Sequence, residues 1–165
     1  MTNGRPSKEE YYLRIAEEVA ARSTCLRRHF GAVIVRDDQI ISTGYNGAPR
    51  GTPNCFELGV CPREEAGIPA GERYELCRAV HAEANAIIHA SRLEMKDGVL
   101  YLAALDAKTG EILAGVRPCK MCTRLIINAG LREVVVREGP GRYTRYAVAD
   151  WVAADTGKVE PGSGY

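Results

Sequence analysis

The chain has 165 residues, of which 45% are hydrophobic and 26% charged, and its formal net charge is +1. This composition is typical of a single globular domain with a sizeable core, and the near-zero charge argues against a nucleic-acid-binding protein. No apolar run approaches the ~20 residues that span a bilayer, and the first residues lack the apolar core of a signal peptide. We therefore expect a cytoplasmic protein that binds neither nucleic acid nor membrane, whose six cysteines are metal ligands or free thiols.

Helix and strand patterns alternate along the chain. Ser7 and Glu10 form a capping-box pattern ahead of an apolar stripe, which predicts a helix over residues 8–22. Short β-branched runs at residues 31–35 and 39–45 predict a hairpin. After a long loop we expect, in order, a buried helix over 81–92, strands over 99–104 and 111–116, a helix over 119–129, a strand over 132–137, a last helix over 143–154 and a frayed tail over 160–165. This order predicts an α/β domain with three layers, α/β/α, around a central mixed sheet.

The long loop, residues 46–80, has little periodicity and many glycines and prolines. A loop of this length in a compact domain is usually functional or is held by something other than a core. It contains Cys55, Cys61 and Cys77, and Cys25 lies upstream. Two interpretations stay open: these cysteines form a second, structural zinc site, or they are free thiols with Cys25 packed in the core.

Two short motifs carry metal-ligating residue types. His81 and Glu83 stand two residues apart, and Pro118 precedes a Cys-x-x-Cys pair, Cys119 and Cys122. One imidazole and two thiolates leave one of the four positions of Zn²⁺ open for water, whose pKa the ion lowers to about 7. Glu83 would move the protons. Residues i and i+2 lie about 200° apart on a helix, so we expect two helix N-termini to face the ion. A structural zinc knuckle or a redox pair is the alternative for the cysteines.

These motifs are shared with a known family. The sequence resembles the zinc-dependent cytidine deaminase superfamily, and within it the deoxycytidylate (dCMP) deaminases and a bacterial version named as a late competence protein. The resemblance covers about residues 8–137 and includes Gly31-Ala32-Val33-Ile34-Val35, Gly44-Tyr45-Asn46-Gly47-Ala48-Pro49, His81-Ala82-Glu83-Ala84-Asn85-Ala86-Ile87, Pro118-Cys119-x-x-Cys122 and Ile126-Ile127-Asn128-Ala129-Gly130. It implies a cytidine-deaminase-like fold and the reaction of dCMP with water to dUMP and ammonia, which feeds thymidylate synthesis.

The resemblance also implies roles for single residues. By matching positions, His81, Cys119 and Cys122 hold the catalytic zinc and Glu83 is the proton shuttle. The backbone amide of Ala82 meets the carbonyl of the base, and Asn46 contacts the deoxyribose. Members of this branch are homo-oligomers, commonly hexamers, activated by dCTP with Mg²⁺ and inhibited by dTTP, and some carry a second zinc.

Two further substrate contacts come from residue type alone. Arg50 is our candidate for the substrate phosphate, with Arg27, Arg28 and Arg63 behind it, because a guanidinium binds phosphate through two hydrogen bonds. Tyr143 is a candidate to close over the base. The alternatives are a solvated surface arginine and a packed tyrosine.

Alternative functions stay open, and one segment of the chain departs from the pattern of the superfamily. The same chemistry could act on another cytosine or amino-bearing nucleoside, nucleotide or base, or the chain could be a non-catalytic zinc- or nucleotide-binding regulator. Residues 105–116 depart from the superfamily, whose third strand usually runs almost directly into Pro-Cys. We expect one deaminase domain over residues 1–165, with a cysteine-rich insertion at about 46–80 and a flexible tail from about 157.

Overall fold

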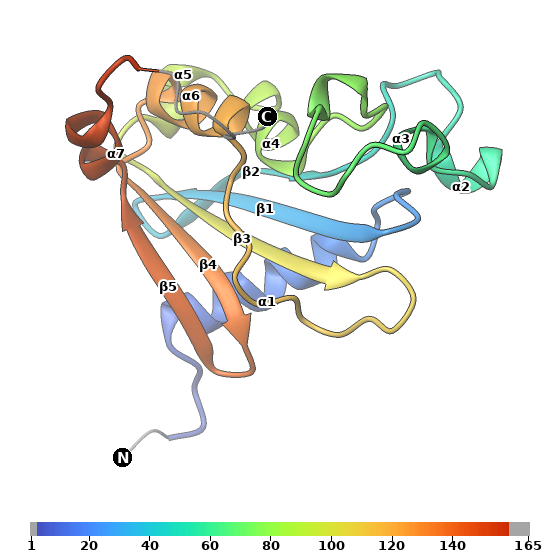
Figure 1. Cartoon of the computed structure of the whole chain (residues 1–165). Helices are drawn as coiled ribbons and strands as arrows, with labels where there is room; N and C mark the ends of the chain where they lie inside the picture. Colours follow the sequence, from blue (N-terminus) through green and yellow to red (C-terminus); the bar gives the residue numbers. More distant parts are fainter. Residues whose placement is uncertain (1–2, 159–165) are drawn as a thin grey trace.

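A computed structural model describes residues 3–158, and its centre is a five-stranded sheet (Figure 1). The strand order is β2-β1-β3-β4-β5. β3 and β4 are parallel and every other neighbouring pair is antiparallel, so the predicted mixed sheet is confirmed. The strands are β1 (Arg28–Arg36), β2 (Gln39–Tyr45), β3 (Val99–Asp106), β4 (Glu133–Gly139) and β5 (Arg142–Ala147).

One face of the sheet is covered by the helix α1 (Lys8–Ala20) alone. The Ser7 hydroxyl accepts a hydrogen bond from the Glu10 backbone N–H at 3.2 Å, which is half of the predicted capping box. The helix lies directly on β1, because a Cβ at Gly31 would be 2.1 Å from the Ala16 carbonyl oxygen. A glycine is therefore required at this crossing.

The other face is covered by four helices, which completes the predicted three layers (Figure 1). They are α4 (Ala82–Ile88), α5 (Arg92–Met95), α6 (Lys120–Ala129) and α7 (Val148–Ala154). α4 lies against β2 at Gly44, where a Cβ would be 2.3 Å from the Ala86 nitrogen. The Ser42 hydroxyl donates to the Ala86 carbonyl at 2.6 Å. These contacts fix α4, and with it the first motif, on the sheet.

Residues 46–80 contain only short helices: α2 (Cys55–Leu58), α3 (Pro62–Glu65) and the 3₁₀ turn η1 (Tyr74–Leu76). The two ends of this segment are joined by an antiparallel bridge between Gly47 and Val80. The loop therefore starts and ends beside α4, and its interior continues the helical side of the molecule outward from α4 (Figure 1).

Three predicted elements differ from the structure. Residues 142–147 are a strand rather than helix, because the segment returns from the 139–141 turn and pairs with β4, and its alternating exposed side chains hide the usual apolar pattern. The helix expected over 81–92 ends at Ile88, since Ser91 and Glu94 cap a new helix, α5. Residues 111–116 make a single bridge, Ile112 to Leu105, instead of a strand.

The tail predicted over residues 160–165 lies outside the described part of the chain. Within residues 3–158, no helix has both the length and the apolar character needed to cross a membrane.

Candidate active site

His81 is the N-cap of α4. Its backbone is extended rather than helical, with φ −68° and ψ 154°. Its side chain therefore does not follow the helical spacing of the side chains after it. The Asn85 side chain donates to the Tyr45 carbonyl at 2.8 Å and so ties the first turn of α4 to the end of β2. The predicted start of this helix at the first motif is confirmed, and the helix N-terminus faces the second motif.

Cys119 is the N-cap of α6, and Cys122 lies in its first turn. The Cys119 sulfur accepts a hydrogen bond from the Cys122 backbone N–H at 3.5 Å. A helix N-terminus carries partial positive charge, which stabilises a thiolate at this place. The two thiols also interact: a hydrogen bond from the Cys122 side chain holds the pKa of Cys119 well below its usual range.

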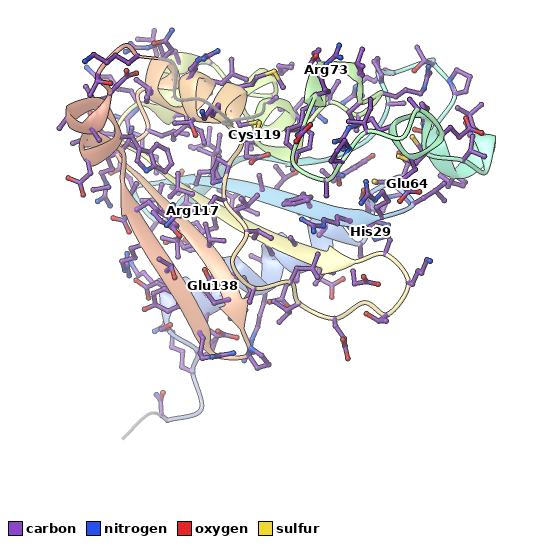
Figure 2. The ribbon with its side chains drawn as sticks, viewed as in Figure 1. His29, Glu64, Arg73, Arg117, Cys119 and Glu138 are labelled. Carbon is purple, nitrogen blue, oxygen red and sulfur yellow. The ribbon has the colours of Figure 1, made fainter. Side chains whose placement is uncertain are left out.

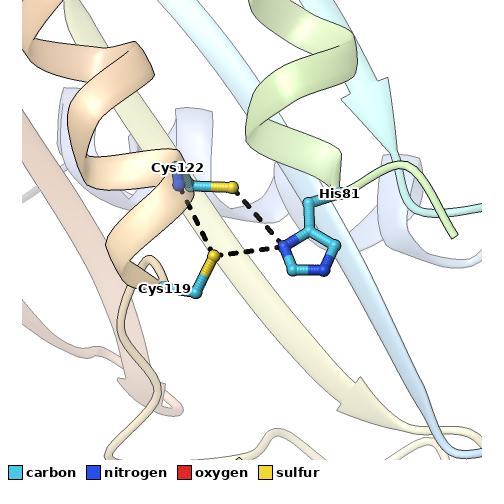
Figure 3. A group of neighbouring side chains, drawn as sticks. All are labelled: His81, Cys119 and Cys122. Atoms are coloured by element: carbon cyan, nitrogen blue, oxygen red, sulfur yellow. Dashed lines mark hydrogen bonds between the residues drawn. The ribbon is translucent and has the colours of Figure 1, made fainter. Parts of the chain in front are cut away.

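The two helix starts bring three ligand atoms together (Figure 3). The Nδ1 atom of His81 lies 3.4 Å from the sulfur of Cys119 and 3.4 Å from the sulfur of Cys122. All three ligand atoms lie within 4.8 Å of one another. Among the described residues, no other group of three or more His, Cys, Asp and Glu side chains meets at that spacing. One imidazole and two thiolates are among the donor sets that hold zinc in sites with one open position.

Glu83 lies beside these three residues, in the first turn of α4, and is only 3% exposed. Burial raises the pKa of its carboxyl group. A raised pKa makes a carboxyl group a better proton acceptor, and a general acid–base must accept a proton and then release it.

Two of the three ligands, His81 and Cys119, line a cavity of about 130 Å³. Its walls include His81, Ala82, Glu83 and Cys119 from the two motifs, and Asn46 from the end of β2. Of the eight residues predicted for the main site, five line this cavity, and Cys122 joins them through its contact with His81.

Asn46 has a structural role in this wall. Its side-chain oxygen accepts from the Phe30 N–H at 2.8 Å, and its side-chain nitrogen donates to the Arg28 carbonyl at 3.0 Å. The amide thus holds the chain at the start of β1 and still has one N–H that none of these contacts uses.

Arg50 and Tyr143 lie elsewhere. Arg50 lines a different hollow, where its guanidinium meets the His89 ring nitrogen at 2.9 Å. Tyr143 lies on β5, opposite Arg137 of β4, and lines a hollow beside α1. Neither residue lines the cavity that contains Glu83.

Two cavity residues were missed from the sequence. Tyr74 packs edge-on against the His81 ring, with centroids 5.4 Å apart, and Arg117 stands just before Pro118. Position next to the second motif was a usable signal for Arg117. Tyr74 lies in the aperiodic loop, so nothing in its local sequence marks it.

The four remaining cysteines gather near the same cavity. Cys25, Cys61 and Cys77 line it, and Cys55 is buried at 8% exposure within electrostatic range of the other three. Burial raises the pKa values of Cys55 and Cys77. Their sulfurs do not reach the mutual spacing of the His81 group, and all six cysteines of the chain are free of disulfides.

Comparisons with known proteins agree with this site. Residues 6–138 match the family model described as "Cytidine and deoxycytidylate deaminase zinc-binding region". A solved structure, that of dCMP deaminase from the cyanophage S-TIM5, superposes with a TM-score of 0.55 at 25% identity and covers 82% of this chain and 86% of that one. The predicted cytidine-deaminase-like fold is confirmed.

Two curated relatives share the name deoxycytidylate deaminase. The Schizosaccharomyces pombe protein is 37% identical over 132 residues, which are 79% of this chain and 37% of that protein. The Mycobacterium phage D29 protein is 38% identical over 136 residues, which are 79% of this chain and 94% of that protein. This chain thus spans little more than a third of the yeast relative and almost all of the phage one. The chain belongs to the cytidine and deoxycytidylate deaminase family.

Proposed function

We propose that this protein catalyses the zinc-dependent hydrolytic deamination of dCMP to dUMP and ammonia. The observation that carries the proposal is that one imidazole and two thiols meet at one point, with a buried carboxyl group beside them that lines the same cavity as His81 and Cys119. The names of the relatives, deoxycytidylate deaminase, support dCMP as the substrate.

His81, Cys119 and Cys122 would hold the zinc. The donor set fits, because the three atoms already lie within 4.8 Å of one another and two of them are sulfurs at a helix N-terminus. Zinc bound there would supply a Lewis acid that activates water for attack on the carbon that bears the amino group. A purely structural site would need no carboxyl group such as Glu83 beside it.

Glu83 would carry the protons. It takes a proton from the attacking water and gives it to the ring nitrogen next to the attacked carbon. Glu83 then takes the remaining proton of the newly added hydroxyl group and passes it to the amino group. The carbon–nitrogen bond breaks, the hydroxyl becomes the carbonyl of the product, and ammonia leaves. The raised pKa of Glu83 suits this double role, since the same group must accept and then release a proton.

Two further groups would orient the nucleotide. The Ala82 backbone N–H lies in the first turn of α4, where amides have no partner within the helix, and it can donate to the carbonyl of the base. The spare N–H of Asn46 can donate to the deoxyribose. Both residues line the cavity.

A second zinc would be held by Cys25, Cys55, Cys61 and Cys77. The support is that Cys25, Cys61 and Cys77 line the same cavity and that buried Cys55 lies within electrostatic range of all three. Four thiolates are the ligand set of a closed structural zinc site, which would fix a loop that has almost no core.

We further propose a cytoplasmic homo-oligomer, with a hexamer favoured by the family resemblance, that is activated by dCTP with Mg²⁺ and inhibited by dTTP. Large apolar side chains stay uncovered on the helical face, among them Leu93 at 81% and Ile88 at 70% exposure. A second copy of the chain would cover such a surface. The free state of all six cysteines supports a reducing compartment.

Ammonia release from zinc-loaded protein tests the proposal, with dCMP, CMP, deoxycytidine and dCTP assayed side by side, each with and without added dCTP and Mg²⁺. We expect dCMP to be the best substrate. Preference for deoxycytidine would move the assignment to a nucleoside deaminase. No turnover of any of the four, with zinc present, would contradict a cytosine deaminase and favour another amino-bearing base or a non-catalytic regulator.

A further inference from the structure

The imidazole ring of His81 is bonded on one side only. Its Nδ1 atom lies 3.4 Å from the sulfur of Cys119 and 3.4 Å from the sulfur of Cys122. Its other ring nitrogen, Nε2, makes no hydrogen bond with any residue between positions 3 and 158. A histidine that binds a metal usually donates its second N–H to a carboxylate, a backbone carbonyl or water, and this bond fixes the orientation of the ring. Among the described protein groups, the orientation of the His81 ring therefore depends on packing.

Tyr74 supplies this packing from the cysteine-rich loop. The ring centroids of Tyr74 and His81 lie 5.4 Å apart, and the two rings are almost perpendicular, at 86°. An edge-to-face arrangement at this distance is one of the favoured geometries of an aromatic pair. Both residues line the same cavity. The Tyr74 ring therefore limits how far the imidazole can turn or tilt.

Arg63 in turn holds Tyr74. Its guanidinium carbon lies 4.7 Å from the centre of the Tyr74 ring, and the residue is only 6% exposed. One terminal nitrogen donates to the carbonyl of Pro69 at 3.1 Å and also to the carbonyl of Glu72. A cation over an aromatic ring is attracted to it, and the attraction grows when water is excluded. Arg63, Tyr74 and His81 thus form a continuous row of contacts from the loop to the metal ligands.

The backbone is bent where it delivers Tyr74 to this row. Arg73 has φ 50° and ψ 48°, in the left-handed region that residues other than glycine rarely adopt, and Gly71 has φ 86°. Figure 2 labels Arg73 in the loop beside α4 and Cys119 at the start of α6, both on the helical side of the sheet. The Arg73 side chain is exposed and pairs with Glu75 at 2.6 Å. Because such conformations gather at functional sites, we attribute this one to the placement of the next residue, Tyr74.

We propose that Tyr74, held by Arg63, is a positioning residue for His81: it keeps the imidazole in the orientation in which Nδ1 meets the two sulfurs. The inference rests on the proposed function, since the ion that His81 would hold is the ion of that reaction. Loss of a group that orients a metal-bound histidine typically costs about 10- to 100-fold in metal affinity or activity. The loop of residues 46–80 thereby contributes to the metal centre through a single ring.

The test follows zinc at His81 itself, with no nucleotide present. The chain has three histidines, so their ring signals can be separated by NMR of histidine-labelled protein. The His81 signal is assigned by its absence from His81→Gln. An excess of chelator is added to zinc-loaded protein, and the rate at which this signal returns to its zinc-free position is the rate of zinc release at this site. A second zinc elsewhere does not enter the measurement.

Two substitutions at Tyr74 separate the ring from the hydroxyl: Tyr74→Leu removes the ring and Tyr74→Phe keeps it. Tyr11→Leu is the matched control, because Tyr11 lies on α1, on the other face of the sheet, and is 50% exposed. Leu76→Ala controls for a change in the same turn, since the Leu76 side chain is 47% exposed and does not line the cavity. Thermal unfolding confirms that each variant is folded.

We expect Tyr74→Leu to release zinc at least about tenfold faster than wild type and to broaden or split the zinc-bound His81 signal. Tyr74→Phe, Tyr11→Leu and Leu76→Ala should match wild type in both respects. Wild-type release by Tyr74→Leu with an unchanged signal would overturn the proposal, and so would an equal acceleration in Leu76→Ala. If Tyr74 served only as a wall for the substrate, release in the absence of nucleotide would stay unchanged, which is the first of these contrary results.

Arg63→Lys tests the second contact and does not depend on the stability of Tyr74→Leu. Lysine keeps the charge but not the planar guanidinium, so we expect faster zinc release than in wild type, by a smaller factor than in Tyr74→Leu. Combined with Tyr74→Leu it should add nothing, because residues that act through a shared contact are not additive. Wild-type release in Arg63→Lys, or full additivity in the double variant, would overturn the role of Arg63. If Tyr74→Leu does not fold, wild-type release in Arg63→Lys overturns the proposal as a whole.

The same measurements separate this proposal from the proposed function. If the His81 signal of wild type does not respond to zinc, the proposed metal site fails and the positioning role fails with it. If the signal responds and Tyr74→Leu releases zinc at the wild-type rate, the metal site stands and the role of Tyr74 fails. If Tyr74→Leu releases zinc faster but wild type does not deaminate dCMP, the role of Tyr74 stands and the proposed reaction fails.

Discussion

Glu83 and Arg137 are almost completely buried on opposite faces of one sheet, yet their surroundings differ. Arg137 is 1% exposed and makes ion pairs with Glu10 at 2.6 Å and Glu17 at 2.5 Å, both on α1. Glu83 is 3% exposed, faces the cavity, and makes no ion pair with any residue in the described part of the chain. One of these buried groups is held by ion pairs and the other is not.

The difference teaches what each face of the sheet does. A buried charge with partners contributes to stability, because removing one partner leaves the other buried without an opposite charge. A buried carboxyl group in a cavity, with a raised pKa and metal-ligating neighbours, is typical of a reactive site. We therefore expect substitutions on the α1 face to lower stability and substitutions at the cavity to lower activity. Losses that do not separate in this way would contradict the division.

The largest effect is expected from the ligand set. Cys122→Ser removes a sulfur from the group that would hold zinc, so we expect the variant to lose the ion and its turnover of dCMP to fall to the rate in buffer alone. Zinc per chain and ammonia release on the same sample check this. Full activity in a variant that binds no zinc would contradict the site.

The opposite face should respond in stability alone. Arg137→Met leaves Glu17 without its cation and Glu10 with Arg14 alone. We expect a loss of about 3 kcal/mol in the free energy of unfolding, at the low end for a broken buried pair because water reaches both carboxylates. Urea unfolding measures the loss. Turnover well below the unfolding midpoint should stay near that of wild type; lost turnover with unchanged stability would break the comparison.

A substitution in the cysteine-rich loop, on the same side of the sheet as the cavity, should have an effect of intermediate size. Cys61→Ser should lower the zinc content from about two ions per chain to about one and reduce the unfolding free energy by about 1–2 kcal/mol, a common size for a single-site change. The remaining ion should still support turnover, in contrast to Cys122→Ser. An unchanged zinc content would count against the four-cysteine site.

The smallest effect concerns pH. The hydrogen bond from Arg137 lowers the pKa of Glu10 below its ordinary value of 4.5. A carboxyl group with a lowered folded-state pKa adds stability above its unfolded pKa and loses it as the pH falls through the folded value. The stability gap between wild type and Arg137→Met should therefore be constant above pH 5 and shrink below pH 4.5. Unfolding midpoints from pH 7 to pH 3 measure it, and a gap that widens in acid would contradict the pairing.

The sequence predicted the centre of this molecule well, for a physical reason. His81, Glu83, Cys119 and Cys122 stand at the starts of two helices, where short-range spacing determines which way each side chain points. The hairpin and α1 were predicted from patterns of the same local kind, and both are confirmed.

The cavity rim could not be predicted in the same way. Arg50 was chosen by residue type, but its place is set by a contact with His89, 39 positions away in the chain. The part played by Tyr74 depends on how an aperiodic loop folds back onto His81. Long-range packing of this kind leaves no periodic signal.

The most direct test of the account is ammonia release from dCMP by Glu83→Gln beside wild type, at matched zinc content. Gln keeps the shape of the side chain and cannot carry the proton. The account predicts that the variant keeps its zinc and its affinity for dUMP while its turnover falls by about 10²- to 10⁴-fold, the usual contribution of a general acid–base. Deamination of dCMP by Glu83→Gln at the wild-type rate would contradict the proposed mechanism.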